Sequence, residues 1–406
     1  MLFTFVILFL TLGCDLAYGQ GEEGNEKEEV MVTLDFSKKG AFGLKNNTSQ
    51  SVLTNITFKV QDLSVSLYGM TCHFEGTNTY LRLDGNNNNN PGQISISVPN
   101  PAVIKSATLG TNRYKITNLH AKYTYNGKEK DEEISVKANK TATVSSINSN
   151  NVSFIEKGSD QSFITTITLT ITRPKLDATL DEKAFDAEST IKGIVGENKT
   201  LALNRTFNPS QLYTMCLPFD LSRDMITEIF GNETKVYSYD GYHNGELSFS
   251  IVKEVKAGMP FLMRPEYYVE QPTFADVTVE STTAQTVGGG EWDLCGTFGS
   301  LELAADGTQL FLTADGTLAK PKVGSQKMRG FRCYLQKAAG TVNGSAQLPS
   351  VTIDGETNAI KTAEYAAPTS ATTAYSLSGM KLNAGCKTAN GGIMIIDGKK
   401  FITTNR

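Results

Sequence analysis

Four side chains in the first half of the chain are the best candidates for binding a ligand. Tyr80 and Arg82 are two residues apart, and so are Tyr123 and Tyr125. Residues at this spacing in a β-strand lie on the same face of the sheet. A flat aromatic ring beside polar groups can stack on the apolar face of a sugar, but tyrosine is also a common strand residue that packs across a sheet. The sequence leaves both roles open, carbohydrate contact and sheet packing.

The histidines and cysteines do not form a catalytic or metal-binding pattern. The three histidines, His73, His120 and His243, lack the paired spacing of metal ligands. Cys72 and His73 are neighbours, but adjacent side chains of a strand point to opposite faces and cannot form a nucleophile–base pair. Neither a nucleophile-elbow motif nor a phosphate-binding loop occurs. We therefore expect no enzyme activity, no metal ion and no cofactor.

The acidic and amide residues also match neither a calcium-binding loop nor a glycosidase active site. The loop from Asp84 to Asn90 offers oxygen ligands for calcium, but Asn89 stands where an EF-hand needs glycine and no acid occupies the twelfth position. A glycosidase needs two carboxylates that face each other. The adjacent pairs Glu132–Glu133 and Asp181–Glu182 would instead point to opposite faces of a strand. A polar turn and solvated charges are the expected roles.

The N-terminus has the pattern of an export signal. Leu2 to Leu12 is an almost unbroken apolar run, too short to span a bilayer comfortably, and the small-residue site Ala17-Tyr18-Gly19 follows it. We predict a signal peptide over residues 1–19 and a solvated acidic leader over residues 20–30. Lipid attachment at Cys14 is the alternative to cleavage. Either outcome places the protein outside the cytoplasm, secreted or on the outer cell surface.

Length and charge narrow the class of protein further. With 406 residues the chain can form two ordinary hydrophobic cores. Its net charge of −4 and pI near 5.6 argue against a nucleic-acid partner. No later segment has the length and apolar character of a membrane span. A lipid anchor is therefore the only membrane contact that we expect.

Residues 31–174 predict an N-terminal β-sandwich. Apolar and hydroxylated residues alternate over Leu63–Leu67, Ile94–Val98 and Ile167–Ile171. Each strand would offer one apolar face to a core and one polar face to water, and two such sheets stack into a sandwich. We expect a jelly-roll-like arrangement, with the domain boundary near Pro174.

Residues 175–360 predict a second β domain, of the same antiparallel sandwich class, with one short helix over 222–231. Ser222 can cap the first turn of that helix and Gly231 can end it. Residues 361–374 have the composition of a linker. Residues 375–406 then form a small β tail, in which Asp397-Gly398 is a strong hairpin signal. The predicted fold class is therefore all-β throughout.

Removal of the signal peptide leaves an odd number of cysteines in an oxidising compartment. Cys216 and Cys333 both lie in predicted strands of the second domain. A disulfide between them is one hypothesis, and a role as small buried hydrophobic residues is the other. The remaining cysteines are Cys72, Cys295 and Cys386.

An ordered series of short motifs runs through the second half of the chain, over residues 180–406. The motifs are Leu180-Asp181-Glu182, Arg205-Thr206-Phe207, Cys216-Leu217-Pro218-Phe219, Phe230-Gly231, Ala257 to Leu262, Gly330-Phe331-Arg332, Tyr375 to Leu382 and Ile395 to Lys400. In this order they resemble the C-terminal β module of many secreted or surface proteins of Bacteroidetes, whose closing segment is similar to type IX secretion sorting tails. Two positions depart from the family: Leu212-Tyr213 stands where it usually has Trp-Asn, and Cys333 where it usually has a small residue. The resemblance implies no catalytic residue.

These observations together predict an exported, non-catalytic protein that acts by binding or display. The first hypothesis is an adhesin or surface scaffold whose partner is a host or matrix surface protein. The alternative is a carbohydrate-binding protein of a polysaccharide-utilisation system, with the two tyrosine-bearing strand faces as its glycan contacts. Exposure of Tyr80, Tyr123 and Tyr125 on a concave sheet face would favour the glycan, and burial of all three would favour the scaffold.

Overall fold

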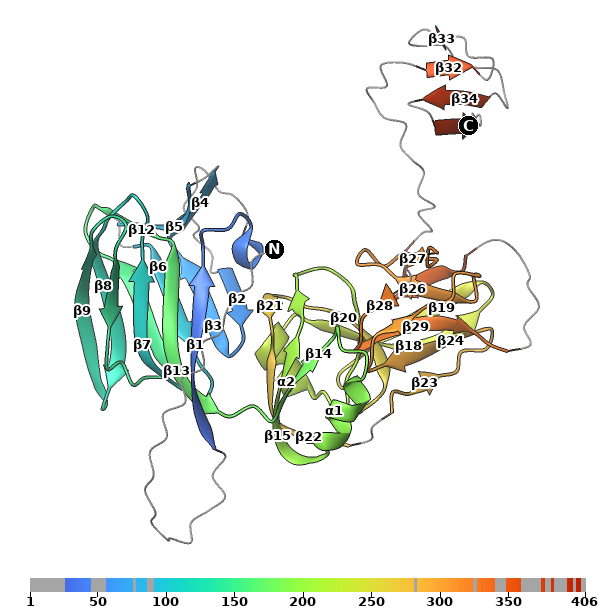
Figure 1. Cartoon of the computed structure of the whole chain (residues 1–406), viewed down its shortest axis with the longest axis horizontal. Helices are drawn as coiled ribbons and strands as arrows, with labels where there is room; N and C mark the ends of the chain where they lie inside the picture. The colour runs from blue at the N-terminus through green and yellow to red at the C-terminus, as the bar shows by residue number, and fades with distance from the viewer. Residues whose placement is uncertain are drawn as a thin grey trace. The chain divides into compact units, whose positions relative to one another are not determined.

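The computed structural model describes residues 26–44, 56–75, 78–85, 91–280, 283–323, 327–339 and 348–358, together with four short strands between 374 and 402. Strands make up most of this chain, so the predicted all-β class is confirmed (Figure 1). By its internal contacts the chain divides into a unit of Met1–Asn358 and a unit of Ala359–Arg406. Among the described residues no helix is long and apolar enough to cross a membrane.

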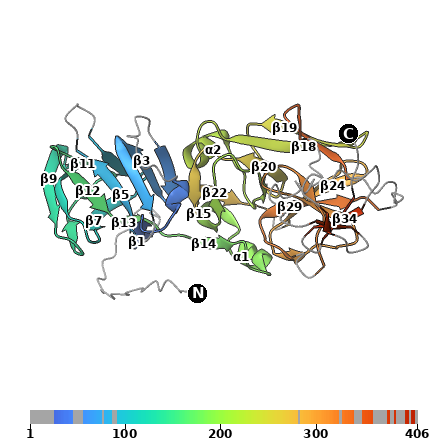
Figure 2. The same ribbon diagram turned by 90° about the horizontal axis from the view of Figure 1, so that it is seen from above.

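The first part of the chain is a β-sandwich. Seen from above, β3 and β11 lie in one layer and β7 and β13 in the other (Figure 2). One layer has the order β2 (Ile56–Val60), β3 (Leu63–Tyr68), β6 (Gln93–Ser97), β11 (Asn151–Glu156), β8 (Ile116–Tyr125) and β9 (Lys128–Val136). The other contains β1 (Lys27–Asp35), β13 (Thr166–Pro174), β7 (Val103–Gly110) and β10 (Thr141–Val144), and a separate sheet contains β12 (Gln161–Ile164), β5 (Asn78–Asp84) and β4 (Met70–Glu75).

The period-two pattern of the sequence explains why these strands form layers. In β3 the side chains of Leu63, Val65 and Leu67 are fully buried, whereas Ser64 and Ser66 are only partly covered. The inward-facing residues of both layers belong to one hydrophobic cluster. Burial of these apolar faces is the main stabilising contribution to the sandwich.

One sheet continues from the sandwich into the second domain. β21 (Tyr268–Glu270) pairs in parallel with β2, so that Phe58 lies opposite Tyr268, and β16 (Thr206–Phe207) pairs with β21. The Phe42 ring, in the short 3-10 helix η1 (Ala41–Gly43), stacks on the Phe58 ring with 4.7 Å between centroids. The same ring meets Tyr268 edge-on at 6.1 Å. Backbone hydrogen bonds and aromatic packing therefore join the two predicted domains, which belong to one compact unit.

The second domain contains several small sheets around two hydrophobic clusters. Its first sheet contains β14 (Ala178–Asp181), β15 (Gly196–Asn204) and β22 (Thr273–Val279). A second contains β17 (Tyr213–Cys216), β20 (Pro260–Arg264), β18 (Lys235–His243), β19 (Glu246–Val252), β30 (Ser350–Ile353) and β31 (Glu356–Asn358). A third contains β23 (Thr286–Val287), β24 (Trp292–Thr297), β29 (Arg332–Lys337), β26 (Gln309–Leu312) and β27 (Leu318–Ala319), and β25 (Leu301–Glu302) pairs with β28 (Lys327–Met328).

The predicted helix is confirmed as α2 (Arg223–Phe230). The Ser222 hydroxyl accepts a hydrogen bond from the Met225 backbone N–H at 3.3 Å, and Gly231 ends the helix with a φ of 106°. This cap satisfies one of the free N–H groups of the first turn. A second helix, α1 (Ala187–Gly193), was not predicted because its segment is only weakly periodic. It begins at an Asp186 cap, whose carboxylate accepts from the Ser189 backbone N–H at 3.1 Å.

The predicted disulfide between Cys216 and Cys333 is wrong. Both residues and Cys295 are free and buried. Their side chains pack into different hydrophobic clusters, and the thiols donate to different backbone oxygens, Cys216 to Gly258 O at 3.2 Å and Cys333 to Phe261 O at 3.6 Å. Burial, named first among the causes, raises the pKa of both thiols. These cysteines act as small buried hydrophobic residues, the second of the two hypotheses.

Several predictions fall outside the described residues. These include the signal peptide over 1–19, the lipid attachment at Cys14 and all of the linker over 361–374 except Ala374. β1 begins at Lys27, so the last residues of the predicted leader are paired in a sheet. In the C-terminal unit, β32 (Ala374–Ser376), β33 (Lys381–Leu382), β34 (Ile393–Ile396) and β35 (Lys399–Ile402) form one sheet. The predicted turn at 397–398 lies outside the described residues, and Ile396 pairs with Lys399 on either side of it.

Candidate functional site

The outward face of β5 and β12 brings one predicted pair of ligand contacts together with new residues. Leu81 and Leu83 of β5 are in the core of the sandwich. Strand alternation therefore directs Tyr80 and Arg82 outward. On the neighbouring strand Phe163 lies directly opposite Arg82 in the antiparallel register. We call the residues Tyr80, Arg82, Asp84, Arg113, Tyr114 and Phe163 the β5–β12 face.

Three aromatic rings form the apolar part of the β5–β12 face. The rings of Tyr114 and Phe163 are stacked with 4.6 Å between centroids and an interplanar angle of 28°. Tyr80 meets both rings edge-on, at 5.5 Å from Tyr114 and 5.0 Å from Phe163. Tyr80 is 6% exposed, whereas Tyr114 and Phe163 are half-buried. Tyr80 thus supports the other two rings, and those two are the ones that a ligand can reach.

Two arginines and one aspartate form the polar part of this face. The Arg82 side chain pairs with Asp84, with Nε to Oδ1 at 3.0 Å and Nη2 to Oδ2 at 3.2 Å. The exposed Arg113 guanidinium lies 4.8 Å from the centroid of the Tyr114 ring and donates to the Tyr114 hydroxyl at 2.7 Å. Arg82 and Asp84 balance each other's charge. The face therefore combines accessible rings with fixed donors and acceptors and has little excess charge beyond Arg113.

The other predicted pair, Tyr123 and Tyr125, lies on the core side of β8. Leu119, Ala121 and Tyr123 all belong to the hydrophobic cluster of the sandwich, and Tyr125 packs against it. The Tyr123 hydroxyl reaches the edge and donates to Glu132 at 2.5 Å. Burial, followed by this carboxylate, raises the pKa of Tyr123 to about 12. Tyr123 is therefore part of the sandwich packing, and the structure does not bring it together with Tyr80 and Arg82.

Of the sequence candidates that the structure describes, His120 lies in a network of surface charges. His120 contacts Asp131 at 2.6 Å, and Lys157 contacts the same carboxylate at 2.7 Å. These hydrogen bonds, from Lys157 first and His120 second, hold the pKa of Asp131 below its ordinary value. Within the described residues no group of three His, Cys, Asp or Glu side chains could hold a metal ion. His120 is thus one member of a surface charge network.

Three residues of the β5–β12 face, Arg113, Tyr114 and Phe163, escaped sequence reasoning. Phe163 had a local signal, because it lies between buried Ser162 and Ile164 and so occupies the outward side of β12. Tyr114 had none. It lies in the connection between β7 and β8, and its contact with Phe163 joins residues far apart in the chain.

Glu156 is a buried carboxylate that the sequence did not single out. It is 0% exposed, and no well-aligned hydrogen bond to either of its oxygens occurs among the described residues. Burial raises the pKa of Glu156 to about 7; the nearby Ser162 hydroxyl opposes the rise, and the Asp160 and Asp84 carboxylates add to it. A buried carboxyl group in this position is therefore protonated over most of the acidic range.

This carboxyl group predicts a pH dependence of stability. Because its pKa is higher in the folded protein than the ordinary 4.5, its contribution to stability is greatest below pH 4.5 and is lost as the pH rises through about 7. The shift corresponds to a loss of about 3 kcal/mol at most. Glu156→Gln, which keeps the shape of the protonated form, should unfold at higher urea than the wild type at about pH 8 and at similar urea at about pH 4.5. The exposed Glu133→Gln is the control, and a destabilised Glu156→Gln at about pH 8 would contradict this role.

Comparisons with known proteins give little further information. No protein-family model matches the chain, and no curated protein matches it. Among solved structures, part of the chain is similar to a mutant of CBM29-2, described as a probe of ligand recognition by family 29 carbohydrate-binding modules. The two sequences are 13% identical, the match covers 34% of this chain and 91% of that chain, and the TM-score is 0.21. A likeness at this level carries no argument about function.

Proposed function

We propose that this protein is an exported, non-catalytic protein that binds glycans through the β5–β12 face. The observation that supports the proposal is the stacked Tyr114–Phe163 pair beside the Arg82–Asp84 pair on an outward sheet face. Aromatic rings can pack on the C–H face of a sugar, and charged groups fixed by each other can hydrogen-bond its hydroxyls. The near balance of charge between Arg82 and Asp84 favours a neutral sugar over a strongly anionic one. Export is supported by the signal-peptide pattern of residues 1–19.

The Arg113 side chain affects how a glycan would approach. It lies against the Tyr114 ring but is itself exposed, so a sugar can displace it at small energetic cost. Phe163 packs against the rings of Tyr114 and Tyr80 and is half-buried, and it is the ring on which the test depends. Its partial burial makes removal of the ring tolerable for folding.

Affinity electrophoresis of the purified chain against a broad panel of neutral polysaccharides tests this function. We expect at least one polysaccharide to retard the wild type, and Phe163→Ala to lose this retardation. Loss of a ring contact of about 1.5 kcal/mol or more should weaken binding roughly tenfold or more. Tyr123→Phe is the matched control, because that ring packs in the core and should leave binding unchanged.

Either of two results would overturn the proposal. One is that no polysaccharide in the panel is bound. The other is that Phe163→Ala, with unchanged circular dichroism, still binds like the wild type. Retention on a host or matrix protein in the first case would favour the adhesin or scaffold hypothesis instead.

A further inference from the structure

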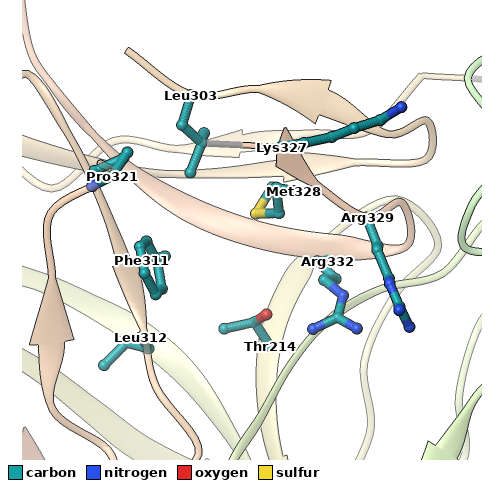
Figure 3. Close-up of a pocket in the computed structure, with 9 residues that line it drawn as sticks. All are labelled: Thr214, Leu303, Phe311, Leu312, Pro321, Lys327, Met328, Arg329 and Arg332. Atoms are coloured by element: carbon teal, nitrogen blue, oxygen red, sulfur yellow. The ribbon is translucent and has the colours of Figure 1, made fainter. Parts of the chain in front are cut away.

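The second domain contains a pocket with arginines at one end and apolar side chains at the other. Its volume is about 270 Å³. Figure 3 shows Arg329 and Arg332 side by side, with Phe311 across the pocket from them. The complete lining is Thr214, Leu303, Phe311, Leu312, Pro321, Lys327, Met328, Arg329 and Arg332.

The arginines of this pocket share a single buried carboxylate, that of Glu182. Glu182 is 4% exposed, so its predicted role as a solvated charge is wrong. Its Oε2 accepts from Arg332 Nη2 at 2.7 Å, and its Oε1 accepts from Arg329 Nη1. Arg205 Nε lies 3.7 Å from Oε2, as a third cation. Three guanidinium groups therefore face one carboxylate.

Arg205 is the buried member of this network and links it to the pocket lining. Its Nη1 donates to the carbonyl oxygen of Thr214, a pocket residue, at 3.0 Å. Burial first, and the positive Arg332 second, lower the pKa of Arg205 to about 9, although Glu182 opposes this change. Of these causes, only the repulsion from Arg332 reports on neighbouring positive charge.

Hydrogen-bond donors that have no acceptor also favour the binding of an anion. Arg332 Nε, Arg205 Nε and Arg205 Nη2 are buried and have no hydrogen-bond partner among the residues that the structure describes. Buried donors without acceptors cost free energy, and an added anion could offset this cost. Lys327 adds a further positive charge to the lining, and Glu302 lies opposite it in the β25–β28 pairing. The charged side chains that line the pocket are therefore all positive.

We infer that this pocket binds a small ligand in which a carboxylate is joined to an apolar body. Arg329 and Arg332 would hold the carboxylate, since a guanidinium binds a carboxylate through two parallel N–H bonds. Phe311, Leu303 and Met328 would pack against the apolar body. Neither the sandwich nor its β5–β12 face contributes to this site, so the inference is independent of glycan binding.

Two pairs of small molecules separate the effect of the carboxylate from the effect of the body that carries it. Hexanoate and galacturonate carry the carboxylate on an aliphatic chain and on a sugar ring, and hexanamide and galactose are their uncharged counterparts. Isothermal titration of the full chain should show hexanoate bound roughly tenfold more tightly than hexanamide. Binding of galacturonate without binding of hexanoate would contradict the apolar body of the ligand.

Variants of Arg329 locate the binding. Arg329 is 55% exposed, so its replacement should leave the fold intact. Arg329→Gln should weaken the bound carboxylate roughly tenfold, and Arg329→Lys, which keeps the charge but loses the paired donors, should weaken it less. Lys128→Gln, which removes an exposed cation of the sandwich outside the β5–β12 face, should have no effect.

The inference is overturned if neither carboxylate binds more tightly than its uncharged counterpart. It is also overturned if the binding is unchanged in folded Arg329→Gln, because the ligand would then lie elsewhere. Loss of neutral-glycan binding in Phe163→Ala is a separate result and does not bear on this pocket.

Discussion

Glu182→Gln should lower the free energy of unfolding by about 3–5 kcal/mol, the largest effect that we expect from a single substitution in this chain. The variant leaves Arg205, which is fully buried, and the partly buried Arg332 without an opposing charge. Breaking one side of a buried ion pair is strongly destabilising because the remaining charge has neither water nor a partner. Urea unfolding at neutral pH, followed by circular dichroism, measures the change.

The pH dependence of this effect has a definite sign. Burial would raise the pKa of Glu182, but Arg332, Arg329 and Arg205 outweigh burial and hold the pKa below its ordinary value of 4.5. The stabilisation is therefore fully present above pH 4.5 and is lost as the pH falls through the lowered pKa. The exposed Glu197→Gln is the control. A Glu182→Gln variant as stable as Glu197→Gln at neutral pH would contradict the role of this carboxylate.

Gly330→Ala should destabilise the same region by about 3 kcal/mol, at the upper end of the range for added atoms in a packed site. A Cβ at this position would lie 2.1 Å from the backbone oxygen of Phe298 and 3.1 Å from the backbone carbon of Gly299. Because both obstacles are backbone atoms, no side-chain rotation can relieve the contact. The shift would also disturb the hydrogen bond from Gly330 N–H to the carbonyl oxygen of Glu182, now 2.7 Å long.

The matched control for Gly330→Ala is Gly193→Ala. Gly193 ends α1, and an added Cβ there meets no atom within 4 Å. Alanine also favours a helix more than glycine does, so this variant should unfold at equal or slightly higher urea than the wild type. Equal stability of the two alanine variants would show that the contact at Gly330 is not as close as described.

The sequence predicted those parts of the fold that depend on local patterns. Alternation of apolar and hydroxylated residues predicted strands such as β3, and the Ser222 cap with Gly231 predicted α2. The hydrogen bonds and apolar burial that form these elements follow from neighbouring residues. The Cys216–Cys333 disulfide failed for the opposite reason, because strand membership does not tell which cluster a side chain enters.

The candidate site could be predicted only in part. Spacing correctly placed Tyr80 and Arg82 on one strand face, but Tyr114 comes to that face through tertiary packing alone. The burial of Tyr123 could have been predicted, because the apolar residues Leu119 and Ala121 precede it on the same side of β8 and are buried with it. The pocket lined by Arg329 and Arg332 could not be predicted either, because it also depends on tertiary packing. Glu182 and Arg332 are 150 residues apart, and only the fold brings them into contact.

The most direct test of glycan binding is hydrogen exchange of the chain with and without a bound oligosaccharide from a retained polysaccharide. Binding at the β5–β12 face should slow amide exchange in residues 80–84, 111–115 and 161–164 and leave the second domain unchanged. This pattern, absent in Phe163→Ala, is the expected result. Slowed exchange confined to the second domain, or none anywhere at saturating oligosaccharide, would contradict the proposed function.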